Sequence, residues 1–142
     1  MQTASTPRTI ALIGAPTDIG AGHRGASMGP EALRVAGLAQ ALRERGLQVL
    51  DKGNLAGPVN PWLPPVDGYR HLAEVVDWNR SVMDAMYASL QAGELPILLG
   101  GDHCLGTGSI TAVARYCRER GKHLRILWLD AHADFNTHAV TP

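Results

Sequence analysis

The chain has little cysteine and no long apolar run. It has only two cysteines among its 142 residues, Cys104 and Cys117, which are too few for the disulfide framework of a small secreted protein. Residues 1–8 lack the apolar core of a signal peptide. No apolar stretch approaches the roughly 20 residues that cross a bilayer. We therefore expect a cytoplasmic protein without a membrane partner.

The sequence also has no excess of charge of either sign. Its 13 Lys and Arg residues balance 13 Asp and Glu residues, so the formal net charge is zero. Nucleic acids and anionic membranes attract proteins with a basic excess, so neither is expected as a partner. A small-molecule partner fits this composition better. The length suits one domain with a core of its own.

Apolar periodicity predicts strands that alternate with helices. Four short apolar runs are typical of buried strands: residues 9–14, 47–51, 95–99 and 124–130. Three segments repeat apolar residues every three or four positions, as helices do: residues 31–45, 69–91 and 108–120. This alternation predicts a single α/β domain over residues 1–142. Its parallel sheet should carry helices on both faces, in three α/β/α layers.

Polar residues follow three of the predicted strands. They lie in residues 18–24, at residues 102 and 103, and in residues 130–136. In parallel sheets, ligand sites form beyond the carboxyl ends of the strands. We therefore expect these three segments to meet at one site.

The last of these segments carries three potential metal ligands at alternate positions, Asp130, His132 and Asp134. In an extended chain, alternate side chains project from one face about 6.6 Å apart. Such a row fits two metal ions about 3.5–4 Å apart. The alternative is a strand end with solvated polar residues, but this alternation after a buried strand favours metal ligands.

His103 follows a pair of glycines, which allow close backbone approach and could hold the imidazole against a site. Alone, it could equally be a structural residue. Beside Asp130, His132 and Asp134, it completes a nitrogen and oxygen ligand set that suits Mn, Zn, Fe or Ni. Cys104 is expected to be a small packed side chain rather than a ligand.

Two motifs resemble signatures of the ureohydrolases, the arginase and agmatinase family. They are Gly-Gly-Asp-His at residues 100–103 and Asp-Ala-His-Ala-Asp at residues 130–134. Residues 13–16 and 24–34 resemble the N-terminal strand and first helix of the same family. The resemblance is closest to arginase and covers most of the chain. It implies an arginase-like fold and, for a complete protein, a homotrimer or hexamer.

The resemblance also implies a binuclear manganese site. His103 and Asp134 would bind one Mn(II), His132 would bind the second, and Asp130 would bridge the two. A hydroxide held by the metals would hydrolyse the guanidinium group of L-arginine to L-ornithine and urea. Guanidinium carbon is a poor electrophile, and two metal ions can supply a strong nucleophile near neutral pH.

Residues beyond the metal motif bear on the substrate. The order Asp-Phe-Asn at residues 134–136 resembles arginase, which implies that Asn136 and Thr141 bind the α-carboxylate of L-arginine. They could instead be loop residues that bond their own backbone. Agmatinase, or another guanidino or formimino hydrolase, is then the alternative function. Arg24 is interpreted as structural, because its charge would repel a cationic substrate.

Several family elements have no match in this chain. No residue matches the family's proton-transfer His, its remaining metal carboxylates or its guanidinium-binding Glu, so no catalytic residue is assigned. Two ions need about eight donor contacts. The four ligands supply about five if one of them bridges. We expect the N-terminal part of a longer ureohydrolase domain that binds Mn(II) weakly and lacks turnover by itself. A non-catalytic metal-binding or regulatory domain is the alternative of another class.

Overall fold

The computed structural model describes residues 9–132 and 134. Its elements run in the order β1 (Ile10–Ala15), η1 (Ala26–Met28), α1 (Gly29–Val35), α2 (Leu38–Glu44), β2 (Val49–Asn54), α3 (Leu72–Gln91), β3 (Leu95–Gly100), η2 (His103–Leu105) and α4 (Gly106–Glu119). Among these residues, no helix has the length and apolar character needed to cross a bilayer.

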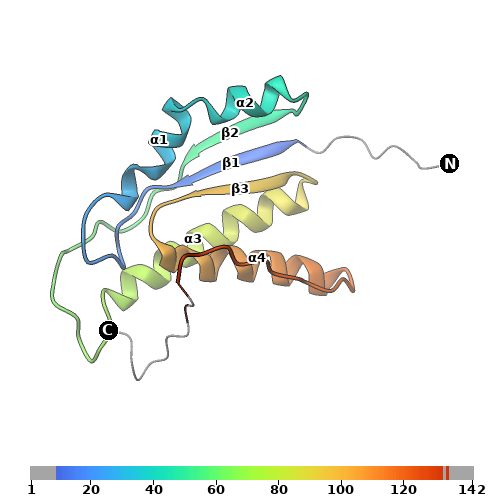
Figure 1. Cartoon of the computed structure of the whole chain (residues 1–142). Helices are drawn as coiled ribbons and strands as arrows, with labels where there is room; N and C mark the ends of the chain where they lie inside the picture. Colours follow the sequence, from blue (N-terminus) through green and yellow to red (C-terminus); the bar gives the residue numbers. More distant parts are fainter. Residues whose placement is uncertain (1–8, 133, 135–142) are drawn as a thin grey trace.

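The three strands form one parallel sheet in the order β2-β1-β3 (Figure 1). All six residues of the central strand β1 are buried. Its sequence, Ile-Ala-Leu-Ile-Gly-Ala, has no polar side chain, so helices can cover both of its faces without burying a charge. The predicted parallel sheet is confirmed.

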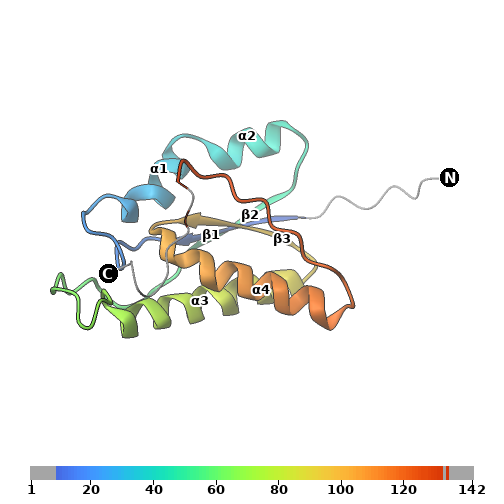
Figure 2. The same ribbon diagram turned by 60° about the horizontal axis from the view of Figure 1, so that its bottom comes forward.

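Helices cover both faces of the sheet, as Figure 2 shows: α1 and α2 on one side, α3 and α4 on the other. Ile13 of β1 belongs to a buried cluster with Trp78 and Val82 of α3. Leu12, its neighbour in sequence, packs with Leu38 and other apolar residues on the opposite face. Successive strand residues point to opposite faces, so one strand supplies both cores. The predicted three-layer arrangement is confirmed.

The predicted helix over residues 31–45 is two helices. Gly37 has φ 83°, a left-handed conformation that only glycine adopts without strain, and it separates α1 from α2. Val35 is 88% exposed at the end of α1. In α2, Leu38 and Leu42 pack against the core.

The predicted strand over residues 124–130 is wrong. This segment has no regular structure and returns beside α4 (Figures 1 and 2), and its residues 124–126 line a cavity of about 240 Å³ together with residues of α3 and α4. Leu127 and Leu129 are 83% and 87% exposed. Within the described part of the chain, β3 pairs with β1 alone. A strand needs a hydrogen-bonding neighbour, and this segment runs beside α4 rather than along the second edge of β3.

Candidate metal centre

The loop after β3 passes close to the end of β1. A side chain on Gly101 would overlap the carbonyl oxygen of Ala15, and Gly101 has φ 155°. One on Gly29 would overlap the carbonyl oxygen of Gly100. Glycine at residues 29 and 101 therefore allows the close approach that delivers His103 to the carboxyl end of the sheet.

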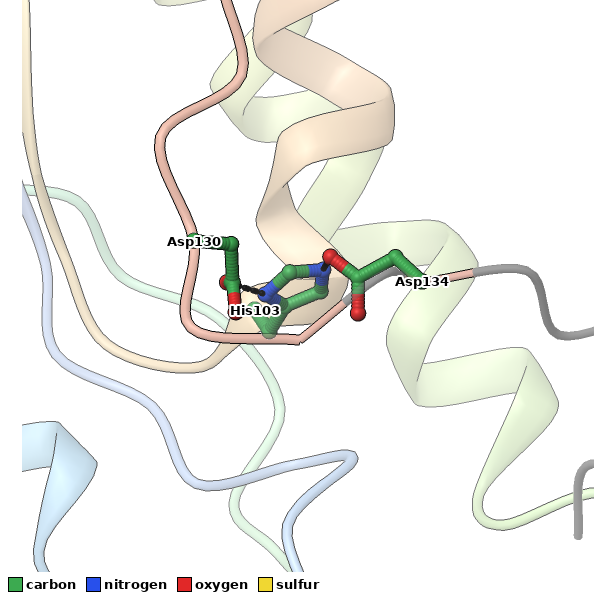
Figure 3. A group of neighbouring side chains, drawn as sticks. All are labelled: His103, Asp130 and Asp134. Carbon is green, nitrogen blue, oxygen red and sulfur yellow. Dashed lines mark ion pairs between the residues drawn. The ribbon is translucent and has the colours of Figure 1, made fainter.

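The structure brings His103, Asp130 and Asp134 together (Figure 3). His103 Nδ1 lies 3.7 Å from Asp130 Oδ2, and His103 Nε2 lies 3.5 Å from Asp134 Oδ2. One donor atom from each residue lies within 4.8 Å of the other two, and all three residues are exposed. Imidazole nitrogen and carboxylate oxygen donors at such spacings fit a divalent transition metal such as Mn(II).

His132 contacts the other carboxylate oxygen of Asp130. Its Nδ1 is 3.0 Å from Asp130 Oδ1, and its backbone N–H donates to the same oxygen at 2.7 Å. Asp130 thus turns one oxygen toward each imidazole. When Nδ1 of His132 carries the proton, Nε2 keeps a free lone pair for a ligand. His132 itself is not part of the cluster of three.

The pKa of Asp130 is lowered from its ordinary value. The largest cause is the hydrogen bond from the His132 backbone N–H; desolvation opposes it, and the His132 side chain and the charges of His132 and His103 lower the pKa further. These groups stabilise the ionised carboxylate, which is the form that binds a metal ion.

Trp128 contacts two members of the cluster, and sequence reasoning missed it. Its ring meets the His103 ring edge to face, with centroids 5.2 Å apart and planes at 77°. Its Nε1 donates to Asp134 Oδ2 at 2.7 Å. Residue 128 continues the series of every second position formed by residues 130, 132 and 134. This spacing could have identified Trp128 from the sequence.

Cys104 is half-buried and packs against the core formed by α3 and α4, as predicted. Burial, followed by the charge of Asp102, raises the pKa of its thiol to about 12. The thiol therefore stays protonated at neutral pH, and a protonated thiol is a poor metal ligand.

Residues 18–24, predicted to join the site, do not enter the metal-ligand cluster. Asp18 is 8% exposed, and Gly25 and Ser27 donate hydrogen bonds to its carboxylate within its own loop. The Arg24 guanidinium lies over the Trp62 ring, 5.1 Å from its centroid, in agreement with the structural interpretation. Asn136 and Thr141, the predicted substrate contacts, lie outside the described residues.

The fold and the cluster define a class of protein. It is an α/β protein with a parallel sheet and a cluster of imidazole and carboxylate side chains beyond the ends of its strands. The Arginase family matches residues 8–142, and the chain belongs to that family. The predicted family and fold are confirmed.

Three relatives show how far the similarity extends. The arginase of Agrobacterium fabrum is 40% identical over 135 residues, which cover 94% of this chain and 42% of the relative. The structure of Bacillus caldovelox arginase matches with TM-score 0.84 and 32% identity, over 95% of this chain and 44% of that one. Entamoeba histolytica arginase, solved in complex with L-ornithine, matches with TM-score 0.83 and 27% identity, over 97% and 46%. The chain thus spans less than half the length of each of these relatives.

Proposed function

We propose that this chain supplies four of the ligands of a binuclear manganese site. In the complete protein this site would hydrolyse L-arginine to L-ornithine and urea. The convergence of His103, Asp130 and Asp134, with His132 on the other carboxylate oxygen of Asp130, carries the proposal. Membership of the Arginase family supports it.

The charged and neutral residues of the site have different proposed roles. Asp130 and Asp134 offset the charge of the metal ions and of a cationic guanidinium group. The imidazoles of His103 and His132 add neutral donors, and Trp128 orients His103 and Asp134. When bound, Mn(II) lowers the pKa of water toward neutrality and so supplies a hydroxide nucleophile.

The donor count limits what the chain does by itself. Four side chains, with Asp130 shared, offer about five of the roughly eight contacts that two ions require. Weak Mn(II) binding and no turnover are therefore expected from this chain alone. For the whole protein, a homotrimer or hexamer and a cytoplasmic location stay predictions.

Asn136 and Thr141 are proposed to bind the α-carboxylate of L-arginine through an amide and a hydroxyl group. The E. histolytica relative was solved with L-ornithine, an amino acid that carries the same α-carboxylate. Agmatine lacks this group, so comparing the turnover of L-arginine and agmatine by the complete protein tests the assignment, and L-arginine should be preferred. Faster turnover of agmatine would contradict the roles of both residues.

A Mn(II) titration of the chain, followed by the electron paramagnetic resonance signal of free Mn(II), tests the metal site. The His132→Ala and Asp134→Asn variants should each weaken binding about tenfold or more, because the first removes a nitrogen donor and the second removes a negative charge. His123→Ala is the matched control, since His123 is exposed and lies outside the cluster.

Two results would contradict the proposal. A chain that binds no Mn(II) would favour a non-catalytic or regulatory domain of the same fold. Urea release from L-arginine by the purified chain would contradict the donor count.

A further inference from the structure

We propose that Asp102 is the positioning residue for His103, and that it acts by tying the loop after β3 to the loop after β1. This inference rests on the proposed metal site, because it assigns a partner to one of that site's ligands. Asp102 itself is not assigned as a ligand.

The Asp102 carboxylate joins two segments that are far apart in the sequence. Its Oδ1 accepts a hydrogen bond of 3.2 Å from the backbone N–H of Cys104, the residue directly after His103. Its Oδ2 accepts one of 2.5 Å from the backbone N–H of Gly20, in the loop after β1. The two oxygens therefore hold the start of η2 and an independent loop at the same time.

The backbone of Asp102 adds two further hydrogen bonds. Its N–H donates to the carbonyl oxygen of Thr17 at 3.0 Å, and its carbonyl oxygen accepts from the N–H of Leu105 at 3.2 Å. Leu105 is buried in the core between the sheet, α3 and α4. The backbone is thus fixed on both sides of His103.

His103 needs this support because little else holds it. Its side chain is 56% exposed, and its nitrogens lie 3.7 Å and 3.5 Å from the two carboxylates, beyond hydrogen-bond distance. Its described ring contact is the edge-to-face packing with Trp128. A ligand held loosely at its ring depends on a fixed backbone to keep its donor atoms in place.

The contact between Asp102 and Gly20 explains why residue 102 is an aspartate and residue 20 a glycine. A carboxylate accepts two N–H groups from different directions, whereas an amide at the same place would turn one N–H₂ donor toward a backbone N–H. A Cβ atom on Gly20 would come within 2.9 Å of Asp102 Oδ2, so the close approach requires glycine at residue 20. The contact can therefore be disturbed from either side.

Amide hydrogen exchange of the metal-free chain tests the tie itself. Asp102→Ala should speed exchange at the amides of Gly20 and Cys104, since both lose their acceptor. Unchanged exchange at both amides would overturn the proposal whatever the metal does.

Mn(II) affinity tests the consequence, measured on variants at equal folded fraction as followed by circular dichroism. Asp102→Ala and Gly20→Ala should each weaken binding about 10- to 100-fold, the range for partners of metal ligands. Asp102→Asn should weaken it less, because one acceptor oxygen remains. Asp51→Asn is the matched control, because it breaks the ion pair between Asp51 of β2 and Arg34 of α1 and should leave Mn(II) affinity within about twofold.

The outcomes separate the two proposals. Equal Mn(II) affinity in the unchanged chain, Asp102→Ala and Gly20→Ala would overturn the role of Asp102 and leave the metal site standing. An equal loss in Asp51→Asn would show a general effect of stability and would also overturn that role. A chain that binds no Mn(II) at all would overturn both.

Discussion

Asp18 shows how one buried carboxylate organises a loop. It accepts hydrogen bonds from Gly25 N–H at 3.2 Å, from Ser27 N–H at 2.8 Å and from Ser27 Oγ at 2.6 Å. Burial raises the pKa of Asp18, but the hydrogen bonds from Ser27, Gly25 and Ala26 together lower it below the ordinary value of 3.8. The folded protein therefore favours the charged form more than the unfolded chain does.

This depressed pKa predicts a specific dependence of stability on pH. The contribution of Asp18 is complete above the unfolded value near 3.8 and is lost as the pH falls through the lower folded pKa. Asp18→Asn should reduce the free energy of unfolding at pH 7 by about 1–3 kcal/mol. It should also flatten the fall in stability below about pH 4. Urea unfolding from pH 7 to pH 3 measures both effects.

Asp84→Asn is the control for this prediction, because Asp84 is an exposed residue of α3. It should leave stability at pH 7 within about 0.5 kcal/mol of the unchanged chain. If Asp18→Asn and Asp84→Asn gave the same pH profile, the hydrogen bonds to Asp18 would not explain its depressed pKa.

At the scale of elements, Gly93 and Gly101 place different demands on the backbone. Gly93 has φ 79° and open space where a side chain would stand. Gly101 has φ 155°, and a side chain there would overlap the carbonyl oxygens of Ala15 and Thr17. Residue 93 therefore needs glycine only for its positive φ. Residue 101 needs glycine for its φ and also because a Cβ atom would not fit.

We therefore expect unequal costs of alanine at these two glycines. Gly93→Ala should lower the free energy of unfolding by about 1 kcal/mol, from backbone strain. Gly101→Ala should lower it by about 2–4 kcal/mol, because overlap with fixed backbone adds to the strain. Urea unfolding of both variants checks the order, and a larger loss in Gly93→Ala would contradict it.

The sequence predicts best the elements whose signal is local. The wholly apolar run of β1 and the repeating apolar residues of α3 locate both elements within a few residues of their observed ends. The break at Gly37 was missed because one glycine costs a helix only about 1 kcal/mol, which tertiary packing readily overrides. The error at residues 124–130 has a different origin, because an apolar pattern says nothing about which strand lies alongside.

The same contrast between local signals and long-range contacts applies to the candidate site. The meeting of His103 with Asp130 and Asp134 follows from the general position of sites in parallel sheets, and the structure brings these three together. The hydrogen bond between Asp102 and Gly20 joins residues 82 positions apart, and the local sequence does not predict it. The substrate contacts of Asn136 and Thr141 stay predictions.

For the whole molecule, the apolar segment after α4 has a consequence for association. Ile126, Leu127, Trp128 and Leu129 are 54%, 83%, 46% and 87% exposed. Four consecutive exposed apolar side chains form the kind of surface that promotes association between copies. We expect the isolated chain to associate as its concentration rises.

Replacing Leu127 and Leu129 together by Lys should shift the chain toward the monomer, because it removes apolar area and adds like charges. Light scattering over a concentration series measures the change. Val35→Lys is the control, since Val35 is 88% exposed but lies at the end of α1. If Val35→Lys reduced association as much, added charge rather than the apolar segment would be the cause.

The central place of β1 has a consequence for biosynthesis. Ile10 pairs with Val49 on one side and with Leu95 on the other, so the second partner is made about 85 residues after β1. At about 5–20 residues per second, a ribosome takes about 4–17 s to cover that distance. Until β3 is made, the nascent chain holds an apolar strand with at least one edge unpaired, and such edges recruit other chains. We therefore expect the growing polypeptide to be most exposed to association with other chains before β3 is made.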